Sequence, residues 1–200
     1  MKRVLFFTFV FFVASAVFSQ TYSDVPDVLT VIHSRKSVRK FTEQQVSREQ
    51  LETLVKAGMA APTAVNKQPW AFIAIDDREI LDQLAEQLGG NKNLMNACAA
   101  IVVCGDLQKA VESLPDYWVQ DCSAATQNIL LAAEGIGLGA VWMGVYPRDE
   151  RIKAVSTVLN LPENFIPLNV IAIGYPTGVE KPKDKWKTEN LFWNKYEIAK

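Results

Sequence analysis

The feature that most constrains the fold of this chain is a set of short apolar runs separated by longer helix-like segments. The runs span residues 70–75, 97–104, 140–143 and 168–173, and each is bounded by polar, Gly or Pro residues. Apolar runs of this length predict buried strands. Because the strands are few and the helices between them are long, the pattern favours an α+β fold, with a single mixed sheet covered by helices.

Helical spacing predicts the segments that separate these strands. Ser47 and Gln50 form a capping-box pattern that opens a helix, and Pro62 ends it. The other predicted helices span residues 25–34, 77–88, 116–134 and 148–159. Gly135, Gly137 and Gly139 stop the longest of them. A dinucleotide-binding glycine motif would directly follow the first strand, so helix termination and close packing are favoured here over a fingerprint.

The first 19 residues have the layout of a secretory signal peptide. Lys2 and Arg3 precede an apolar run at 4–13, and small residues follow up to Ser19. Cleavage after Ser19 is the preferred prediction, with cleavage after Ala16 as the alternative. An uncleaved membrane anchor is the other interpretation, but the run is short for a stable span. We therefore expect export to the periplasm or beyond, without a stable membrane anchor.

Charge and cysteine content exclude several classes of protein. Without the signal, 19 basic residues stand against 22 acidic ones, a net charge of −3, so no nucleic-acid partner is expected. The three cysteines, an odd number, lie in apolar surroundings, which favours buried thiols over a disulfide or a reactive centre. His33, the single histidine, argues against a zinc site and against a histidine-dependent hydrolase.

A basic run follows the first predicted helix and suits a phosphorylated ligand. Arg35, Lys36, Ser37 and Arg39 combine three cations with a hydroxyl donor, and arginine makes bidentate contacts to phosphate. Taken alone, such a run is also typical of a solvated face. The same two interpretations apply to the lysines of the stretch 181–187.

The order of the motifs along the chain resembles the nitroreductase family of flavin mononucleotide (FMN) enzymes. An Arg-x-Ser-x-Arg run follows the first helix, and Asn66-Lys-Gln-Pro-Trp70 follows an Ala-Pro helix end. A long helix then closes in glycines before Trp142-Met-Gly144, and the lysine-rich stretch comes last. The resemblance covers residues 25–196. It implies a nitroreductase-like α+β sandwich that forms an intertwined homodimer with FMN at the subunit interface.

The resemblance also implies roles for individual residues in binding FMN. Arg35, Lys183 and Lys185 would hold its phosphate, Lys36 and Ser37 would contact the ribityl chain or ring edges, and Arg39 would face the pyrimidine end. Pro62, Thr63 and Asn66 would come from the neighbouring subunit, and backbone groups of Trp142, Met143 and Gly144 would line the ring. Tyr117 and Trp118 would form a substrate wall, although packing roles are an open alternative for them, as for the side chain of Trp142.

The activity implied is ping-pong electron transfer through FMN. The donor would be NAD(P)H or another reductant, a choice left open because nicotinamide coenzymes are cytoplasmic and export is expected. Acceptors would be nitroaromatics, quinones or similar small molecules, with dehalogenation or flavin breakdown also open. No catalytic His or carboxylate pair is needed, because the cofactor carries the chemistry. A flavin- or nucleotide-binding module without turnover is the alternative.

Overall fold

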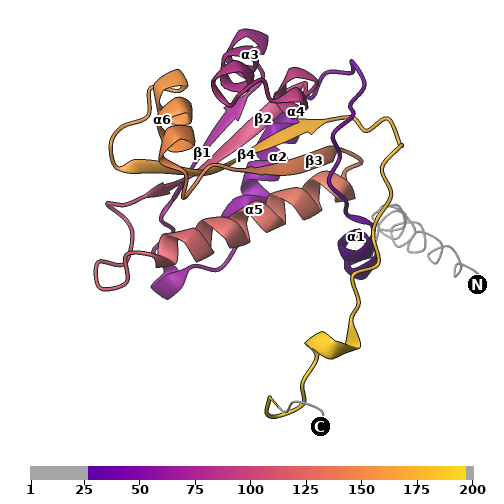
Figure 1. Ribbon diagram of the computed structural model, residues 1–200, viewed down its shortest axis with the longest axis vertical. Coiled ribbons are helices and arrows are strands. Elements are labelled where there is room, and N and C mark those ends of the chain that lie inside the picture. The colour runs from indigo at the N-terminus through magenta and orange to yellow at the C-terminus, as the bar shows by residue number, and fades with distance from the viewer. Residues whose placement is uncertain (1–26, 197–200) are drawn as a thin grey trace, which may run out of the picture.

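The computed structural model describes residues 27–196 of the chain, so the predicted signal peptide at 1–19 lies outside the described residues. A four-stranded sheet in the order β1-β2-β4-β3 forms the centre, with helices on both faces (Figure 1). The strands are β1 (Trp70–Ile75), β2 (Ala99–Asp106), β3 (Gly139–Gly144) and β4 (Phe165–Gly174). The predicted α+β class is confirmed.

The sheet differs from the mixed sheet that was expected. All its strand pairs, β1 with β2, β2 with β4 and β3 with β4, are antiparallel. Within residues 27–196, parallel pairing is confined to an isolated bridge between Ser37 and Ala140. Strands β2 and β3 run in the same direction, but they do not pair with each other because β4 lies between them and runs antiparallel to both.

Six α-helices and two short 3₁₀ turns fill the described part of the chain. They are α1 (Val28–Ser34), α2 (Arg48–Met59), α3 (Arg78–Gln87), α4 (Lys92–Met95), α5 (Tyr117–Gly135) and α6 (Asp149–Val158), with η1 (Ala64–Asn66) and η2 (Thr188–Asn190). The predicted capping box is present, because the Ser47 side chain and the Gln50 side chain each accept a hydrogen bond from the other's backbone N–H.

The core has two apolar layers, one on each face of the sheet. The layer containing Leu54, Ile101 and Ile129 lies between the sheet and helices α2 and α5. The layer containing Leu84 and Val155 lies between the sheet and helices α3 and α6. Strand β2 is buried along its whole length, as a strand covered on both faces must be.

Helix α5 crosses one face of the sheet, and α1 lies near its C-terminal end (Figure 1). The C-terminal tail runs past α1 and away from the sheet (Figure 1). Among the described residues, no helix is both long and apolar enough to cross a membrane. Cys98, Cys104 and Cys122 are all free; the prediction of buried thiols is confirmed for Cys104 and Cys122, whereas Cys98 is only partly buried.

Candidate functional site

The basic run lies as an extended segment beside the edge strand β3. The Val38 N–H donates to the Ala140 carbonyl at 3.0 Å, and Ser37 forms a bridge with the same residue. Val38 is 1% exposed, so it anchors the run in the core. In an extended chain alternate side chains point to opposite sides, which leaves Arg35, Ser37 and Arg39 together on the side away from Val38.

Gly139 makes the close approach of the run to β3 possible. A Cβ atom at this position would lie 2.6 Å from Val38 Cγ1, well inside van der Waals contact. The glycine series after α5 therefore serves helix termination and close packing: Gly137 has a φ of 78°, and Gly139 accommodates Val38. This outcome matches the interpretation favoured over a dinucleotide fingerprint.

The chain after β4 runs back alongside the residues that follow the basic run. The Thr42 N–H donates to the Tyr175 carbonyl at 2.8 Å, and the Thr177 N–H donates to the Lys40 carbonyl at 3.2 Å. This antiparallel contact carries the lysine-rich stretch back toward Arg35, although the two segments are far apart in the sequence.

The two basic segments meet in one cavity. Its volume is about 380 Å³. The lining residues are Arg35, Lys36, Ser37, Arg39, Glu180, Lys181, Lys183 and Lys185. Six of these were singled out from the sequence. A cavity lined by six cations and one carboxylate suits a multiply charged anion such as a phosphate group.

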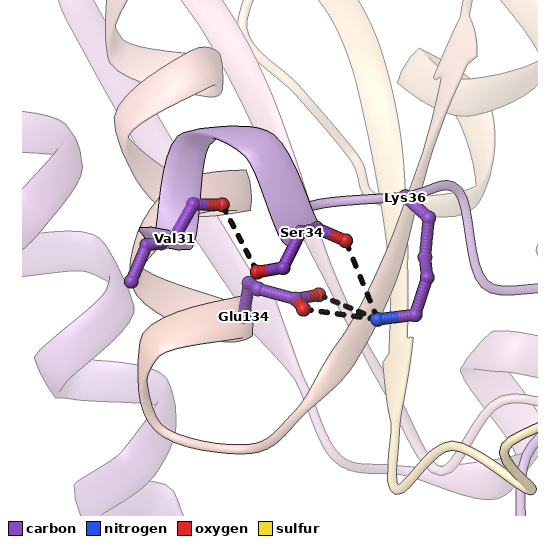
Figure 2. Close-up of polar contacts among 4 residues, drawn as sticks. All are labelled: Val31, Ser34, Lys36 and Glu134. Carbon is purple, nitrogen blue, oxygen red and sulfur yellow. Dashed lines mark hydrogen bonds and ion pairs between the residues drawn. The ribbon is translucent and has the colours of Figure 1, made fainter. Parts of the chain in front are cut away.

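Lys36 is held by an acidic partner on α5. Its Nζ lies 2.9 Å from Glu134 Oε1 and 3.2 Å from Oε2, and it also contacts the Ser34 carbonyl at 3.5 Å (Figure 2). The two side chains are 22% and 15% exposed. Because Nζ is already engaged by two carboxylate oxygens, Lys36 ties the run to α5 and contributes less free charge to the cavity than Arg35 or Arg39.

The loop 62–69 lies at the other end of α5. The Ala64 N–H donates to Asp121 Oδ1 at 2.9 Å, whereas Glu134 near the opposite end of the helix binds Lys36. Because a helix rises about 1.5 Å per residue, these two contacts are separated by about 20 Å along α5. Within one protomer, Pro62, Thr63 and Asn66 are therefore not brought to the cationic cavity.

The loop holds an unusual backbone conformation. Val65 and Asn66 have φ values of 44° and 57°, and left-handed conformations are costly for a β-branched residue such as Val65. Two hydrogen bonds fix the loop: the Gln68 N–H donates to Thr63 Oγ1, and Gln68 Nε2 donates to Asn66 Oδ1. Asp121, 6% exposed, supports it from α5, and its Oδ2 is buried without a partner.

Strand β3 offers free backbone groups at the edge of the sheet. The Ala140 carbonyl points outward to Val38, so the backbone groups of Trp142 and Gly144 also point outward by the two-residue alternation of a strand. Arg151 Nη1 donates a hydrogen bond to the Gly144 carbonyl at 2.8 Å. The backbone of Met143 faces β4, and its side chain is 7% exposed, so among the three predicted ring contacts Trp142 is the most available.

The two candidate wall residues at the start of α5 differ in exposure. Tyr117 is 38% exposed, and Trp118 is 4% exposed. The Trp118 ring lies against Gly105, where a Cβ would collide with it, and meets the Tyr146 ring edge-on at 5.0 Å. Trp118 therefore packs in the core, and Tyr117 is the member of the pair that can meet a ligand.

A larger cavity of about 760 Å³ contains none of the predicted site residues. It lies between the segment 40–45, the start of α3 and the segment 95–98. Its arginine is engaged by the protein: Arg78 donates to the carbonyls of Ala97 and Leu94 at 2.7 and 3.1 Å. Arg78 therefore stabilises the fold, and the smaller cationic cavity is the better candidate site.

Three acidic residues around the candidate site were not foreseen from the sequence: Asp121, Glu134 and Glu180. Their partners lie 57, 98 and about 140 residues away in the chain, beyond the reach of helix or strand periodicity. A usable signal exists only for Glu134, a carboxylate in the last turn of a helix, where the helix dipole favours a cation and a partner is needed.

Comparison with known proteins identifies the family. The sequence pattern described as the "Nitroreductase family" matches residues 32–91 and 85–175. The chain belongs to the nitroreductase family. It is therefore a nitroreductase-family oxidoreductase, in agreement with the resemblance in its motifs.

Relatives within the family cover nearly the whole described fold. A protein of Archaeoglobus fulgidus is 46% identical over 83% of this chain and 93% of its own length. A crystal structure from Parabacteroides distasonis has a TM-score of 0.79 and 46% identity over 84% of this chain and 98% of that one. Both carry the name "Putative NADH dehydrogenase/NAD(P)H nitroreductase". An "FMN-dependent Nitroreductase" from Clostridium difficile has a TM-score of 0.76 at 29% identity over 84% of this chain and 99% of its own.

Proposed function

We propose that the protein is an FMN-dependent oxidoreductase that passes electrons from NAD(P)H, or another reduced donor, to nitroaromatic, quinone or similar small acceptors. The observation that carries this proposal is the cavity that unites Arg35, Ser37 and Arg39 with the late lysines. Family relatives named as FMN-dependent and as NAD(P)H nitroreductases support the choice of cofactor and donor.

The cavity fits the phosphate end of FMN. Arg35 offers a planar fork of donors for phosphate oxygens, and Lys183 and Lys185 add charge from the tail segment. Arg39, whose Nη1 rests on the Ser37 carbonyl at 3.4 Å, is exposed and free to turn toward a ligand. The same cations would bind a molecule without a phosphate much less strongly, because their charge would go uncompensated.

FMN supplies the electron transfer when bound, and the residues of the chain supply binding and orientation. The Trp142 backbone at the sheet edge is available as a donor and acceptor for the flavin ring, and the residue is 36% exposed. Tyr117 begins α5, near the contact of this helix with the loop 62–69, so it would restrict access for acceptors at the site to which that loop contributes. In a ping-pong scheme, the donor leaves before the acceptor occupies the same space.

We also propose that the complete site is shared between the subunits of an intertwined homodimer. The cationic cavity and the loop 62–69 contact opposite ends of α5, so one flavin can meet both only if the second element comes from another copy. Large apolar side chains on the tail also lack cover in a single protomer: Trp186 is 68% exposed and Trp193 is 79% exposed. Ile32 on α1 is also exposed, and the tail runs past α1 (Figure 1).

The first test is spectroscopic. The purified protein is expected to be yellow, to bleach anaerobically with NADH or NADPH, and to regain its colour when a quinone or nitroaromatic is added. Arg35→Gln should weaken the uptake of FMN, because it damages the phosphate cavity. Lys153→Gln removes an exposed cation on α6 and serves as its control. Protein that takes up no FMN would contradict the proposal, and protein that binds FMN but never turns over would support the binding-module alternative.

Subunit complementation tests the shared site. Arg35→Gln damages the phosphate cavity, and Asn66→Ala damages the loop, so each homodimer should lose flavin binding. A mixed dimer contains one site with both residues intact and should recover part of it. If verified mixed dimers recover nothing, or if the protein sediments as a monomer, the dimeric site is wrong.

We retain export as a proposal, because residues 1–19 have the three-part signal layout. Cleavage after Ser19 would make Gln20 the first residue. Intact-mass measurement on protein from a periplasmic fraction of the expressing cells checks this directly. A full-length mass in the cytoplasmic fraction alone would reject it.

A further inference from the structure

Glu180 sits where the tail leaves the body of the protein. Its Oε1 accepts hydrogen bonds from the backbone N–H groups of Arg39 and Lys40, at 2.8 and 3.1 Å. One carboxylate oxygen thus receives two consecutive amides of the basic run. Hydrogen bonds from N–H groups to a carboxylate are stronger than those to a neutral acceptor.

Glu180 is also the last anchor of the tail. Upstream of it, Tyr175 and Thr177 are hydrogen-bonded to the segment after the basic run. From residue 181 to residue 196, no hydrogen bond or ion pair within the described protein joins the tail to the rest of the chain. Lys183 is three residues beyond this anchor, and Lys185 is five residues beyond it, so their position depends on it.

The Glu180 carboxylate has one buried oxygen without a partner and lies in a cavity lined by many cations. Oε2 is buried and has no hydrogen-bond partner, and the residue lies in the wall of the cavity among six cations. Burial acts to raise the pKa of Glu180, but the amides of Arg39 and Lys40 outweigh it and hold the pKa below its usual value. The group is therefore charged at neutral pH.

Building on the proposed function, we propose that Glu180 is a positioning residue for the phosphate of FMN. Its carboxylate binds the tail to the basic run and so holds Lys183 and Lys185 in the same cavity as Arg35. Without the hydrogen bonds from Arg39 and Lys40 to Glu180, the two lysines would lie on an unrestrained segment. Ordering that segment would then cost conformational entropy each time the phosphate binds.

A competing effect acts in the opposite direction. A carboxylate in the wall of the cavity repels a phosphate dianion, and if repulsion dominated, removing the charge would tighten binding. The geometry favours the positioning effect over repulsion. Oε1 accepts hydrogen bonds from two amides, and six cations in the cavity outnumber the single carboxylate. The two effects predict opposite signs for the same substitution.

The test compares Glu180→Ala, Glu180→Gln and a charge-matched control, Glu189→Ala, on the exposed tail. Glutamine keeps the accepting oxygen and loses the charge. FMN affinity of the apoprotein should fall about tenfold in E180A, change by about threefold or less in E180Q, and stay unchanged in E189A. Turnover at saturating FMN should be unaltered in E189A, because Glu189 lies on the exposed tail outside the lining of the cavity.

Amide hydrogen exchange gives a readout that does not depend on flavin. Peptides that contain Arg39 and Lys40 should exchange faster in E180A than in E180Q, and E180Q should lie closer to the wild-type rate. Unchanged or tighter FMN binding in E180A overturns the inference while leaving the proposed function intact. A wild-type protein that binds no FMN overturns the proposed function, and this inference falls with it.

Discussion

Lys36 Nζ lies 2.9 Å from Glu134 Oε1, and this ion pair joins the basic run to the C-terminal turn of α5. A carboxylate at this end of a helix faces the negative end of the helix dipole, so it needs a cation nearby. Lys36 therefore stabilises the fold, although the resemblance implied that every cation of the basic run would contact the ligand.

The pair predicts an asymmetric effect on stability. Lys36→Gln leaves Glu134 unpaired and largely shielded from water, and we expect the free energy of unfolding of the apoprotein to fall by about 1–3 kcal/mol. Glu134→Gln removes the charge that needed compensation and should cost less. Urea unfolding of both variants and the double variant measures this.

The exposed pair of Lys56 and Glu52 on α2 provides the control. Its side chains are 75% and 71% exposed, so Glu52→Gln should change stability by about 0.5 kcal/mol or less. Equal effects of E52Q and K36Q would contradict the structural role of the shielded pair.

Gly139 predicts a coupling between packing and flavin binding. Gly139→Ala would drive a Cβ into Val38 and displace the basic run from β3, so we expect a loss of about 1–3 kcal/mol in stability together with weaker FMN binding. Gly144→Ala, whose added Cβ meets nothing within 4 Å, should leave stability unchanged or slightly raised. Thermal unfolding and flavin titration of the two variants check this.

Asp106 predicts a loss of stability in acid. Its side chain is 6% exposed, and its carboxylate accepts a hydrogen bond from Asn164 at 2.7 Å and pairs with Lys109 at 3.1 Å. Burial acts to raise the pKa of Asp106, but these partners prevail and hold it below the usual value. A folded-state pKa below the unfolded one gives stability that is fully present above the ordinary aspartate pKa and is lost as the pH falls from there through the lower folded-state pKa.

Asp106→Asn should therefore lower stability at neutral pH and flatten its decline between about pH 5 and pH 3. Denaturant unfolding across this range, with the exposed Asp184→Asn as a reference, measures the difference. Parallel curves for wild type and D106N would show that Asp106 contributes nothing to the acid response.

The cysteines predict a graded reactivity. Burial raises the pKa of the Cys104 thiol to about 12 and also raises that of Cys122, so neither forms a thiolate at pH 8. Cys98 is only partly buried, and its Sγ contacts the Thr42 carbonyl at 3.3 Å. A thiol reagent should label the native protein once, at Cys98, and Cys98→Ser should abolish this. Native labelling of Cys104 or Cys122, detected by mass spectrometry, would contradict the buried assignment.

Local patterns in the sequence were sufficient for most of the fold. The Ser47 capping box and the strand Trp70–Ile75 were predicted as they are found. Strand β4 begins at Phe165, three residues before the predicted start at Leu168, and the prediction missed these residues because Pro167 interrupts the strand pattern. The proline is tolerated because it pairs with Cys104, where the register between β2 and β4 shifts. Helix α4, with four residues, is too short to show a periodicity.

The candidate site was predictable in its cations but not in its carboxylates. Arg35 and Lys183 each lie in a dense basic segment, which is visible in the sequence. The sequence marks Glu134 only by its place in the last turn of a helix, and it does not mark Glu180 at all, because the partners of both come from distant parts of the chain. The left-handed Val65 was also hidden, since a β-branched residue is the last that local propensity would assign there.

The most direct test of the account compares the binding of FMN and riboflavin, which differ by the phosphate group, to the apoprotein. If the cavity of Arg35, Ser37, Arg39 and the late lysines holds the phosphate, FMN should bind about a hundredfold more tightly than riboflavin. Arg35→Gln should shrink this ratio, and Lys153→Gln should preserve it. Equal affinities for the two flavins, or a ratio that Arg35→Gln leaves unchanged, would contradict the account.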